Sequence, residues 1–382
     1  MIYLDNAATS FPKPVGVYSE VLKCMKNYAA NPGRGSYDMV IEASSKIMDT
    51  RQELSELFNI PNLLNIVFTC NATESLNIGI KGILKPGDHV ISTVIEHNSV
   101  LRPLNCLSKK GITFTLLGVD EKGYLNINNL KKKIRKKTKA IIINHTSNVL
   151  GTVQDIRSIG QIAKESGIIF MVDASQSAGV IPIDVVLDNI DLLAFPGHKG
   201  LYGPQGTGGL YIKEGVNLDS FIQGGTGSDS LSMRQPDFLP DKFESGTLNT
   251  PGIAGLYEGL RFIKKIGIEN IRKHEIMLVE CLIKELKKLS YIKIYGGTEY
   301  ENRGAVVSLN IDNVDASEVG DLLNKKGIAV RTGFHCASLI HNIIGTSQRG
   351  TVRISPGYFN SLDDIEKLIK ALIDIHEKRP FL

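Results

Sequence analysis

A lysine in a glycine-rich turn is the first residue whose position suggests chemistry. Lys199 follows the apolar run Leu192–Phe195, within the segment Pro196-Gly-His-Lys-Gly200. Glycine lets the backbone approach a ligand closely. A lysine amine in a cleft can have its pKa lowered and can bond covalently to an aldehyde. A single lysine is more often a solvated surface charge, so its surroundings have to decide.

Two further segments could supply the groups that such a lysine needs. The segment from Cys70 to Glu74 follows a predicted strand and opens a helix, whose free N–H groups at Ala72 and Thr73 can bind a phosphate. Alternatively, Thr73 is only the N-cap of that helix. Asp173 ends another apolar strand, where its carboxylate could hold a heterocyclic nitrogen protonated, bind a metal or cap the next element. An amine, an anion cradle and a carboxylate together are what a pyridoxal-phosphate site requires.

The elements that must position these residues alternate between strands and helices from about residue 64 to 212. This alternation is typical of a parallel sheet covered by helices on both faces. Helices are predicted at Thr73–Leu84 and Ile156–Ser166. The predicted strands are Asn65–Thr69, His89–Val94, Thr113–Leu117, Ala140–His145, Ile168–Asp173, Leu192–Phe195 and Gly208–Ile212. Ligands bind beyond the carboxyl ends of such strands, so we expect the residues that follow the strands to meet there.

The pattern changes after the glycine-rich segment Gly224–Gly227. The predicted helices are Ile253–Ile266, Ile268–Leu289, Glu318–Lys326 and Leu362–Lys378, and the predicted strands are Ile292–Tyr295, Ala305–Ile311, Ile328–Thr332 and Thr351–Ser355. We therefore predict a large cofactor-binding domain over residues 15–250. A smaller α+β domain is expected over residues 251–382, with residues 1–14 contributing to it.

Composition narrows the class of protein. The 382 residues, 42% of them hydrophobic, are enough for two lobes with full cores, and the net charge is only +4. The basic run Lys131–Lys139 is expected to be a solvated helix face, so no nucleic-acid binding is predicted. Five widely spaced cysteines without a C-x-x-C pair argue against a disulfide framework or a metal site. No leader or long apolar stretch appears, and a cytoplasmic protein without membrane contact is expected.

The chain contains many motifs in the same order as they occur in one known family, and the resemblance covers essentially the whole chain. The chain resembles cysteine desulfurases of the class V aminotransferase group, nearer to the short-loop branch that includes selenocysteine lyases. The motifs are Tyr3-Leu-Asp-Asn-Ala-Ala, Asn71-Ala-Thr-Glu, Glu96-His97, His145-Thr-Ser-Asn-Val-Leu-Gly151, Asp173-Ala-Ser-Gln176, Gly197-His-Lys199, Glu244-Ser-Gly-Thr247, Arg331-Thr-Gly-Phe-His-Cys336 and Val352-Arg353. The resemblance implies the aspartate aminotransferase-like fold (fold type I), with a mostly parallel seven-stranded sheet and a smaller α+β domain.

The resemblance also implies how pyridoxal 5'-phosphate would be held. Lys199 would bond covalently to the cofactor aldehyde, Asp173 would pair with the pyridine nitrogen, and His97 would stack on the ring. Gln176 would bond the ring oxygen. The phosphate would be held by the start of the helix at Ala72 and by the three residues Thr73, His198 and, from a second subunit, Thr247. A homodimer follows from this last assignment.

Substrate binding and catalysis are assigned in the same way. Arg353 resembles the clamp for the carboxylate of the substrate L-cysteine, and Asn148 resembles a residue that helps to position it. Arg34 resembles a substrate-binding residue that reaches across from the second subunit. Alternatively, Arg353 forms only a surface or inter-strand ion pair. Cys336 distinguishes the reaction, because attack of its thiolate on the substrate's γ-sulfur would give alanine and a persulfide. The acceptor of that sulfur would be a protein or a small thiol. The other four cysteines, Cys24, Cys70, Cys106 and Cys281, are expected to be small buried hydrophobic residues.

The chain departs from the family pattern at two positions. Pro196 stands where a phosphate-binding serine is common, and Phe334 stands where many relatives carry histidine. Few residues separate Cys336 from Arg353, which leaves little slack for a long mobile loop, so the acceptor would have to come to the site. His341 is expected to be solvated.

Three alternative functions remain open from the sequence. A selenocysteine lyase would use the same residues on a more reactive substrate. Transamination, racemisation or β-elimination would use the same cofactor, with Cys336 merely structural. A scaffold that has kept the fold without the cofactor chemistry would serve only as a sulfur-relay partner.

Overall fold

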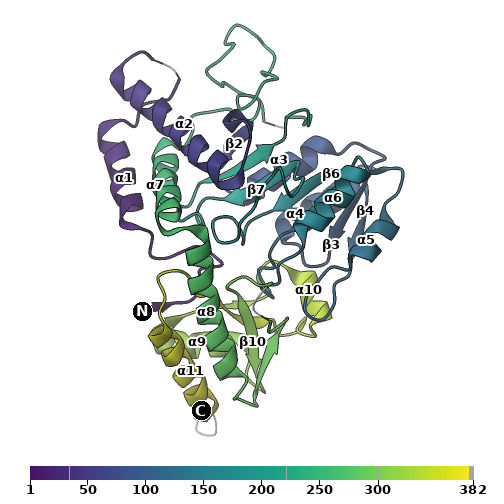
Figure 1. The fold of residues 1–382 in the computed structure, drawn as a ribbon, viewed down its shortest axis with the longest axis vertical. Helices are drawn as coiled ribbons and strands as arrows, with labels where there is room; N and C mark the ends of the chain where they lie inside the picture. The colour runs from purple at the N-terminus through teal and green to yellow at the C-terminus, as the bar shows by residue number, and fades with distance from the viewer. Residues whose placement is uncertain (34, 221, 300–301, 378–382) are drawn as a thin grey trace.

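Two larger sheets organise the chain, an upper seven-stranded sheet and a lower four-stranded sheet in the view of Figure 1, and β1 (Ile2–Tyr3) and β11 (Ile328–Ala329) form a separate two-stranded sheet. The computed structural model describes residues 1–33, 35–220, 222–299 and 302–377. Arg34, which was predicted to reach the substrate, therefore lies outside the described residues.

The large sheet has the strand order β2-β8-β7-β6-β5-β3-β4. Its strands are β2 (Ile66–Thr69), β3 (His89–Thr93), β4 (Thr113–Leu117), β5 (Thr138–Asn144), β6 (Ile169–Asp173), β7 (Leu192–Pro196) and β8 (Gly208–Ile212). All neighbours run parallel except β8, which is antiparallel to both β2 and β7. The predicted seven-stranded, mostly parallel sheet is confirmed, with every strand end within two residues of the observed one.

Helices cover the large sheet on both faces, because its buried strands carry apolar side chains on both sides. Phe170 and Val172 of β6 pack into one core cluster and the intervening Met171 into another, as the alternation along a strand requires. The helices around this sheet are α1 (Val15–Asn27), α2 (Asp38–Phe58), α3 (Ala72–Ile83), α4 (Asn98–Ser108), α5 (Ile127–Lys133), α6 (Ile156–Glu165) and α7 (Thr250–Ile266). Helices α3 and α4 pack against each other.

The small sheet is antiparallel, with the order β12-β13-β10-β9. Its strands are β9 (Ile292–Tyr295), β10 (Val307–Ile311), β12 (Arg331–Gly333) and β13 (Thr351–Ile354), and the helices around it are α8 (Ile268–Leu286), α9 (Ala316–Lys325), α10 (Ser338–Ile343) and α11 (Leu362–Glu377). The prediction of a single strand at Ile328–Thr332 is wrong. This segment forms two strands, because β11 (Ile328–Ala329) pairs with the N-terminal β1 (Ile2–Tyr3) while β12 pairs with β13.

The chain passes from the large core to the small core between α7 and α8. Ile253 and Leu260 of α7 belong to the core of the large sheet, whereas Leu278 and Leu282 of α8 belong to the core of the small one. Gly267 separates the two helices with a φ of 87°, a conformation that glycine adopts without strain. We therefore propose Gly267 as the junction, rather than residue 250.

Several surface predictions need correction. Of the basic run, only Lys131–Lys133 lie on a helix, and Lys139 lies on β5, although all four side chains are exposed. All five cysteines are free, but Cys70 and Cys106 are exposed and Cys281 is half-buried, so only Cys24 is the buried hydrophobic residue expected of the four. The local sequence does not show which face of a helix is buried, or whether a residue at a helix end is covered. This accounts for the difference between expected and observed burial.

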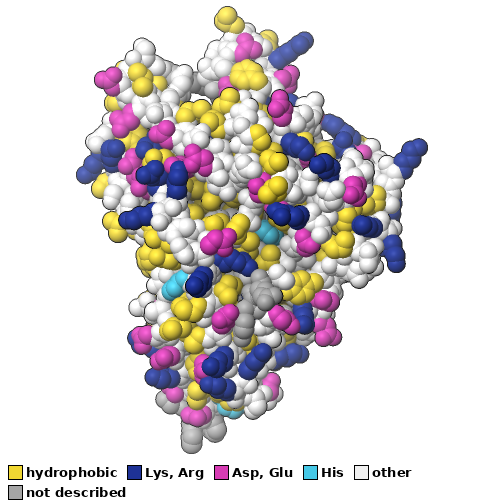
Figure 2. All heavy atoms as spheres, viewed as in Figure 1, with side chains coloured by type: hydrophobic (Ala, Val, Ile, Leu, Met, Phe, Trp, Pro, Cys, Tyr) yellow, Lys and Arg dark blue, Asp and Glu magenta, His cyan; other side chains and the backbone are white. Residues whose placement is uncertain are grey.

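The face shown in Figure 2 carries acidic and basic side chains intermingled rather than gathered by sign.

His341 was expected to be solvated but is fully buried, with Nδ1 2.7 Å from the hydroxyl of Thr346. None of the helices in the described ranges is long and apolar enough to cross a membrane.

Candidate active site

Polar residues that follow strands of the large sheet converge on one cavity, as predicted. The predicted site residues that line it are Ala72, Thr73, His97, Asn148, Asp173, Gln176, His198 and Lys199. Ser99 and Pro196 line it too. Thr247, Arg353 and Cys336 do not, and Thr247 is exposed.

Lys199 provides an amine of unusual acidity in this cavity. Burial lowers the pKa of Lys199 to about 8, because a charged ammonium is poorly solvated there. The negative charge of Asp173 opposes the effect, and the positive charges of Arg353 and Arg331 add to it. About one tenth of the amine is therefore unprotonated at pH 7, far more than for an ordinary lysine, and this is the nucleophilic form.

The start of α3 forms one wall of the cavity. Asn71 is the N-cap, since its side-chain oxygen accepts a hydrogen bond from the backbone N–H of Glu74 at 3.0 Å. The alternative in which Thr73 caps the helix is therefore wrong. The hydroxyl of Thr73 lies 2.8 Å from the hydroxyl of Ser99. The first N–H groups of a helix have no partner within the helix, so this wall combines hydroxyls and N–H donors suited to an anion.

His97 is the N-cap of α4 and is held as a neutral ring. Its Nδ1 accepts the backbone N–H of Ser99 at 3.1 Å, which places the ring proton on Nε2. Burial lowers the pKa of His97, although the charge of Asp173 works in the other direction. A neutral, fixed imidazole can lie against a flat ring without a charge of its own.

Asp173 has the capping role, one of the three that its position suggested, and it also lines the cavity. It is buried at the end of β6, and Oδ1 accepts the backbone N–H of Ser175 at 2.9 Å and the hydroxyl of the same residue at 2.5 Å. It thus caps the following turn. Because Asp173 also lines the cavity, its carboxylate is placed to meet a cationic ring nitrogen.

His198 and Gln176 complete the cavity wall. Burial, together with the charges of Lys199 and Lys13, lowers the pKa of His198 to about 4. In the described structure its buried Nδ1 has no hydrogen-bond partner. Gln176 donates from Nε2 to the backbone carbonyl of Ala7 at 2.9 Å. An unpaired ring nitrogen in a polar cavity is a place for a ligand group.

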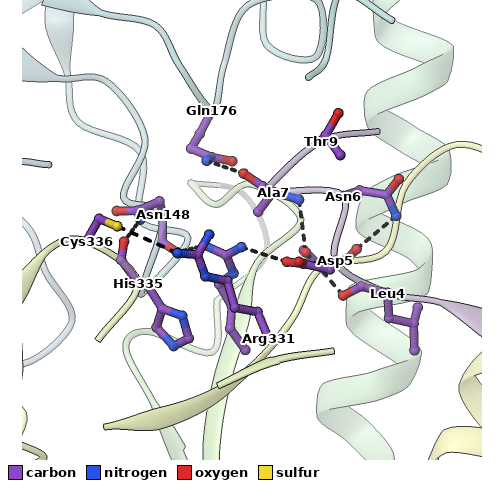
Figure 3. Close-up of polar contacts among 12 residues, drawn as sticks. Leu4, Asp5, Asn6, Ala7, Thr9, Asn148, Gln176, Arg331, His335 and Cys336 are labelled. Atoms are coloured by element: carbon purple, nitrogen blue, oxygen red, sulfur yellow. Dashed lines mark hydrogen bonds and ion pairs between the residues drawn. The ribbon is translucent and has the colours of Figure 1, made fainter. Parts of the chain in front are cut away.

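Cys336 lies in a tight turn between β12 and α10. His335 and Cys336 have φ values of 50° and 59°, and Ala337 donates its N–H to the carbonyl of Phe334 at 3.0 Å. Positive φ at both central residues is costly for residues other than glycine. The thiol is exposed, and its sulfur lies 3.6 Å from Nη2 of Arg331 (Figure 3). The guanidinium therefore donates a hydrogen bond to the sulfur.

Two hydrogen bonds fasten this turn to the large sheet. The carbonyl of His335 accepts Nδ2 of Asn148 at 2.6 Å, and that of Cys336 accepts the N–H of Asn98 at 2.8 Å. The groove beside Cys336 shares Thr73 and His97 with the cavity. The thiol therefore lies beside the cavity and is exposed at the surface.

Arg353 is fully buried on β13 and already paired. Its Nη2 lies 2.8 Å from Oδ1 of Asp5, and Nη1 donates to the carbonyl of Asn148 at 3.2 Å. The sequence had not singled out Asp5 or Arg331, although each lies within a motif quoted above. Ser99 was missed because nothing in the local sequence links it to Thr73.

Comparison with known proteins decides the family. The profile of the class V aminotransferase family matches residues 2–368. The chain belongs to the class V aminotransferases. Enzymes of this class use pyridoxal phosphate in general, and the predicted fold type is thereby confirmed.

Relatives of this class V aminotransferase include a probable cysteine desulfurase from Methanothermobacter thermautotrophicus, 35% identical over 98% of this chain and 94% of that protein. A probable cysteine desulfurase from Pyrococcus abyssi is 36% identical with the same coverage. Among solved structures, the apo cysteine desulfurase from Thermococcus onnurineus has a TM-score of 0.94 and 34% identity, covering 98% of this chain and 94% of that one. The Escherichia coli cysteine desulfurase CsdA has a TM-score of 0.89 and 27% identity, again covering 98% and 94%.

Proposed function

We propose that this class V aminotransferase is a cysteine desulfurase, which converts L-cysteine to L-alanine and takes up the sulfur on Cys336. The carrying observation is an exposed thiol, fastened by a strained turn beside a cavity that holds a low-pKa lysine. The cysteine desulfurase names of relatives that match nearly the whole chain support the same reaction.

The residues of the cavity fit pyridoxal 5'-phosphate. Lys199 would form the covalent bond, Asp173 would meet the pyridine nitrogen, and His97 would cover the ring. Gln176 would bond the ring oxygen. The cofactor, when bound, supplies a ring that accepts electrons and so makes the α-proton of the substrate acidic.

The phosphate would lie at the start of α3. Ala72 and Thr73 would donate from this helix end, and the Nδ1 of His198, which is buried without a partner, would be a further contact for the phosphate. Pro196 contributes no donor. As the family resemblance implies, Thr247 would come from a second subunit, and in its own subunit it lies outside the cavity.

The remaining residues would handle the substrate. Arg353 and Asn148 would orient its carboxylate, as a guanidinium fork suits that group. The sulfur of Cys336 would attack the γ-sulfur of the substrate, so that an S–S bond forms while the bond from that sulfur to the β-carbon breaks. One cysteine and one enzyme thiol thus give one alanine and one persulfide, and the sulfur then passes to an acceptor protein or a small thiol.

The direct test is to incubate the cofactor-loaded protein with L-cysteine and a reductant. Alanine and sulfide should appear in equal amounts, and without reductant a persulfide should be found on the peptide that contains Cys336. Formation of pyruvate instead of alanine would contradict the proposal, since it would mean β-elimination. A parallel assay with L-selenocysteine would measure the preference between the two substrates.

The acidity of Lys199 predicts how cofactor capture depends on pH. The amine attacks an aldehyde only when unprotonated, and its pKa is lowered to about 8. For the cofactor-free protein, the rate of covalent capture of pyridoxal phosphate should rise about tenfold per pH unit below pH 8 and level off above it. Stopped-flow absorbance between pH 6 and 10 measures this. A rate that kept rising to about pH 10.4 would show an ordinary solvated lysine.

A homodimer is part of the proposal, because Thr247 would complete the site of its partner. Exposed apolar side chains on α1 and α2, among them Tyr18, Leu22, Met25 and Met39, offer a surface for association. Light scattering of the purified protein should give twice the mass of one chain. A cytoplasmic location stays a prediction.

A further inference from the structure

The N-terminal segment of residues 4–10, here called the strap, connects the small sheet to the active site (Figure 3). The N–H of Ala7 donates to the hydroxyl of Ser355 just after β13 at 3.0 Å, and the carbonyl of Ala7 accepts Nε2 of Gln176 at 2.9 Å. Ser10 donates its hydroxyl to the carbonyl of Lys199 at 2.9 Å. The strap is therefore bonded to Ser355, Gln176 and Lys199 through Ala7 and Ser10, and Asp5 lies two residues before the first of these contacts.

Asp5 is the one carboxylate paired with the buried guanidinium of Arg353 among the described residues. Arg353 is only 1% exposed, so its charge would be costly to bury alone. A guanidinium has five N–H donors. Asp5 takes one at 2.8 Å and the carbonyl of Asn148 takes another at 3.2 Å, while Nε is buried without a partner. Arg353 thus retains donors for a second carboxylate.

The local charge also calls for a second carboxylate. Burial lowers the pKa of Arg353. The nearby positive charge of Arg331 lowers it further, whereas the negative charge of Asp5 raises it. Two guanidinium charges thus act on each other here, and Asp5 balances one of them. An anionic group that binds here would balance the other without displacing Asp5.

We propose that Asp5 is a positioning residue of the substrate-carboxylate site. It remains bound to Arg353 and fixes the guanidinium so that the unused donors receive the carboxylate of the amino acid. The strap, through its bonds to Ser355 and Gln176, holds Asp5 in place. This inference rests on the proposed function, because it assumes that an amino acid binds at Arg353.

The test compares two amines that differ only in the carboxylate, L-alanine and ethylamine, binding to the cofactor-loaded protein. Affinity is measured from the change in the visible spectrum. Asp5→Ala should weaken alanine binding about 10- to 100-fold, as the loss of a charge-assisted hydrogen bond does. Ethylamine binding should change less than about twofold. Asp5→Asn keeps an acceptor oxygen and should recover most of the alanine affinity.

Two further variants separate positioning from a merely structural effect. In an Arg353→Met background, adding Asp5→Ala should weaken alanine binding no further, because no guanidinium remains to be oriented. Asn6→Ala removes strap contacts to the carbonyl of Ser355 and to Asn360, but it leaves the Asp5–Arg353 pair and the bonds of Ala7 to the Ser355 hydroxyl and to Gln176. It should therefore weaken or preserve the binding of both amines to the same extent. Thermal melting confirms that each variant is folded, and Asp5→Ser replaces Asp5→Ala should the latter not fold.

The inference is overturned if Asp5→Ala weakens both amines equally, leaves alanine binding unchanged, or acts equally strongly without Arg353. These results would leave the proposed function intact as long as the wild type turns over cysteine. A wild type that neither binds alanine nor turns over cysteine would overturn both.

Discussion

Replacing Lys199 with alanine should abolish the production of alanine and sulfide from cysteine, with turnover falling by about 10³-fold or more. The reason is that Lys199 is the proposed covalent anchor of the cofactor. Its buried amine, with a pKa lowered to about 8, is also the group in the cavity best suited to act as a base. Mass spectrometry after borohydride treatment of the loaded wild type should find the cofactor attached to Lys199.

Lys13 provides a demanding control for this experiment. Burial lowers its pKa to about 8 as well, yet its Nζ donates to the carbonyl of His198 at 2.7 Å and to the hydroxyl of Ser10 at 2.8 Å. It does not line the cavity. Acidity alone would allow either amine to be labelled, whereas the geometry selects Lys199. In Lys13→Met the label should stay on Lys199, and a label on Lys13 in the wild type would refute the assignment.

Replacing Cys336 with serine should lower sulfide production from cysteine by about 10²-fold or more while the bound cofactor keeps its spectrum. A hydroxyl is a far poorer nucleophile toward sulfur than a thiolate. The sulfur of Cys336 also accepts a hydrogen bond from the guanidinium of Arg331 at 3.6 Å, which fixes its position. The assay is sulfide release with a reductant, together with a search for the persulfide in tryptic peptides.

Cys106 is the matched control, because it is the other exposed thiol in the groove beside Cys336. Cys106→Ser should keep the persulfide on Cys336 and most of the activity. Full sulfide release by Cys336→Ala would instead mean that the cavity runs a different reaction, such as β-elimination, and that the thiol is structural.

These two residues depend on the structure in different ways. Lys199 needs only a strand end and a glycine turn, both of which are local features of the chain. Cys336 needs two residues with positive φ, and the bonds from Asn98 and Asn148 that hold their carbonyls join segments far apart in sequence. A change at Asn148 therefore reaches the thiol as well as the substrate position.

The sequence by itself determined the large sheet and most of the cavity. Apolar runs with turn residues at their ends fix β3, β6 and β7 locally. Because parallel strands end at one edge, Thr73, Asp173 and Lys199 had to meet there. The order of the motifs was enough to identify the family, which the comparisons then confirmed.

Only the tertiary structure decided which partners these residues have. Asp5 and Arg353 are separated by most of the chain, and no periodicity relates them, yet they form a 2.8 Å ion pair. The segment predicted as one strand at Ile328–Thr332 is divided for the same reason, because its first part pairs with β1 from the other end of the chain. Local patterns report which face of an element is buried, but pairing between distant segments depends on how the elements pack, because packing brings them within bonding distance.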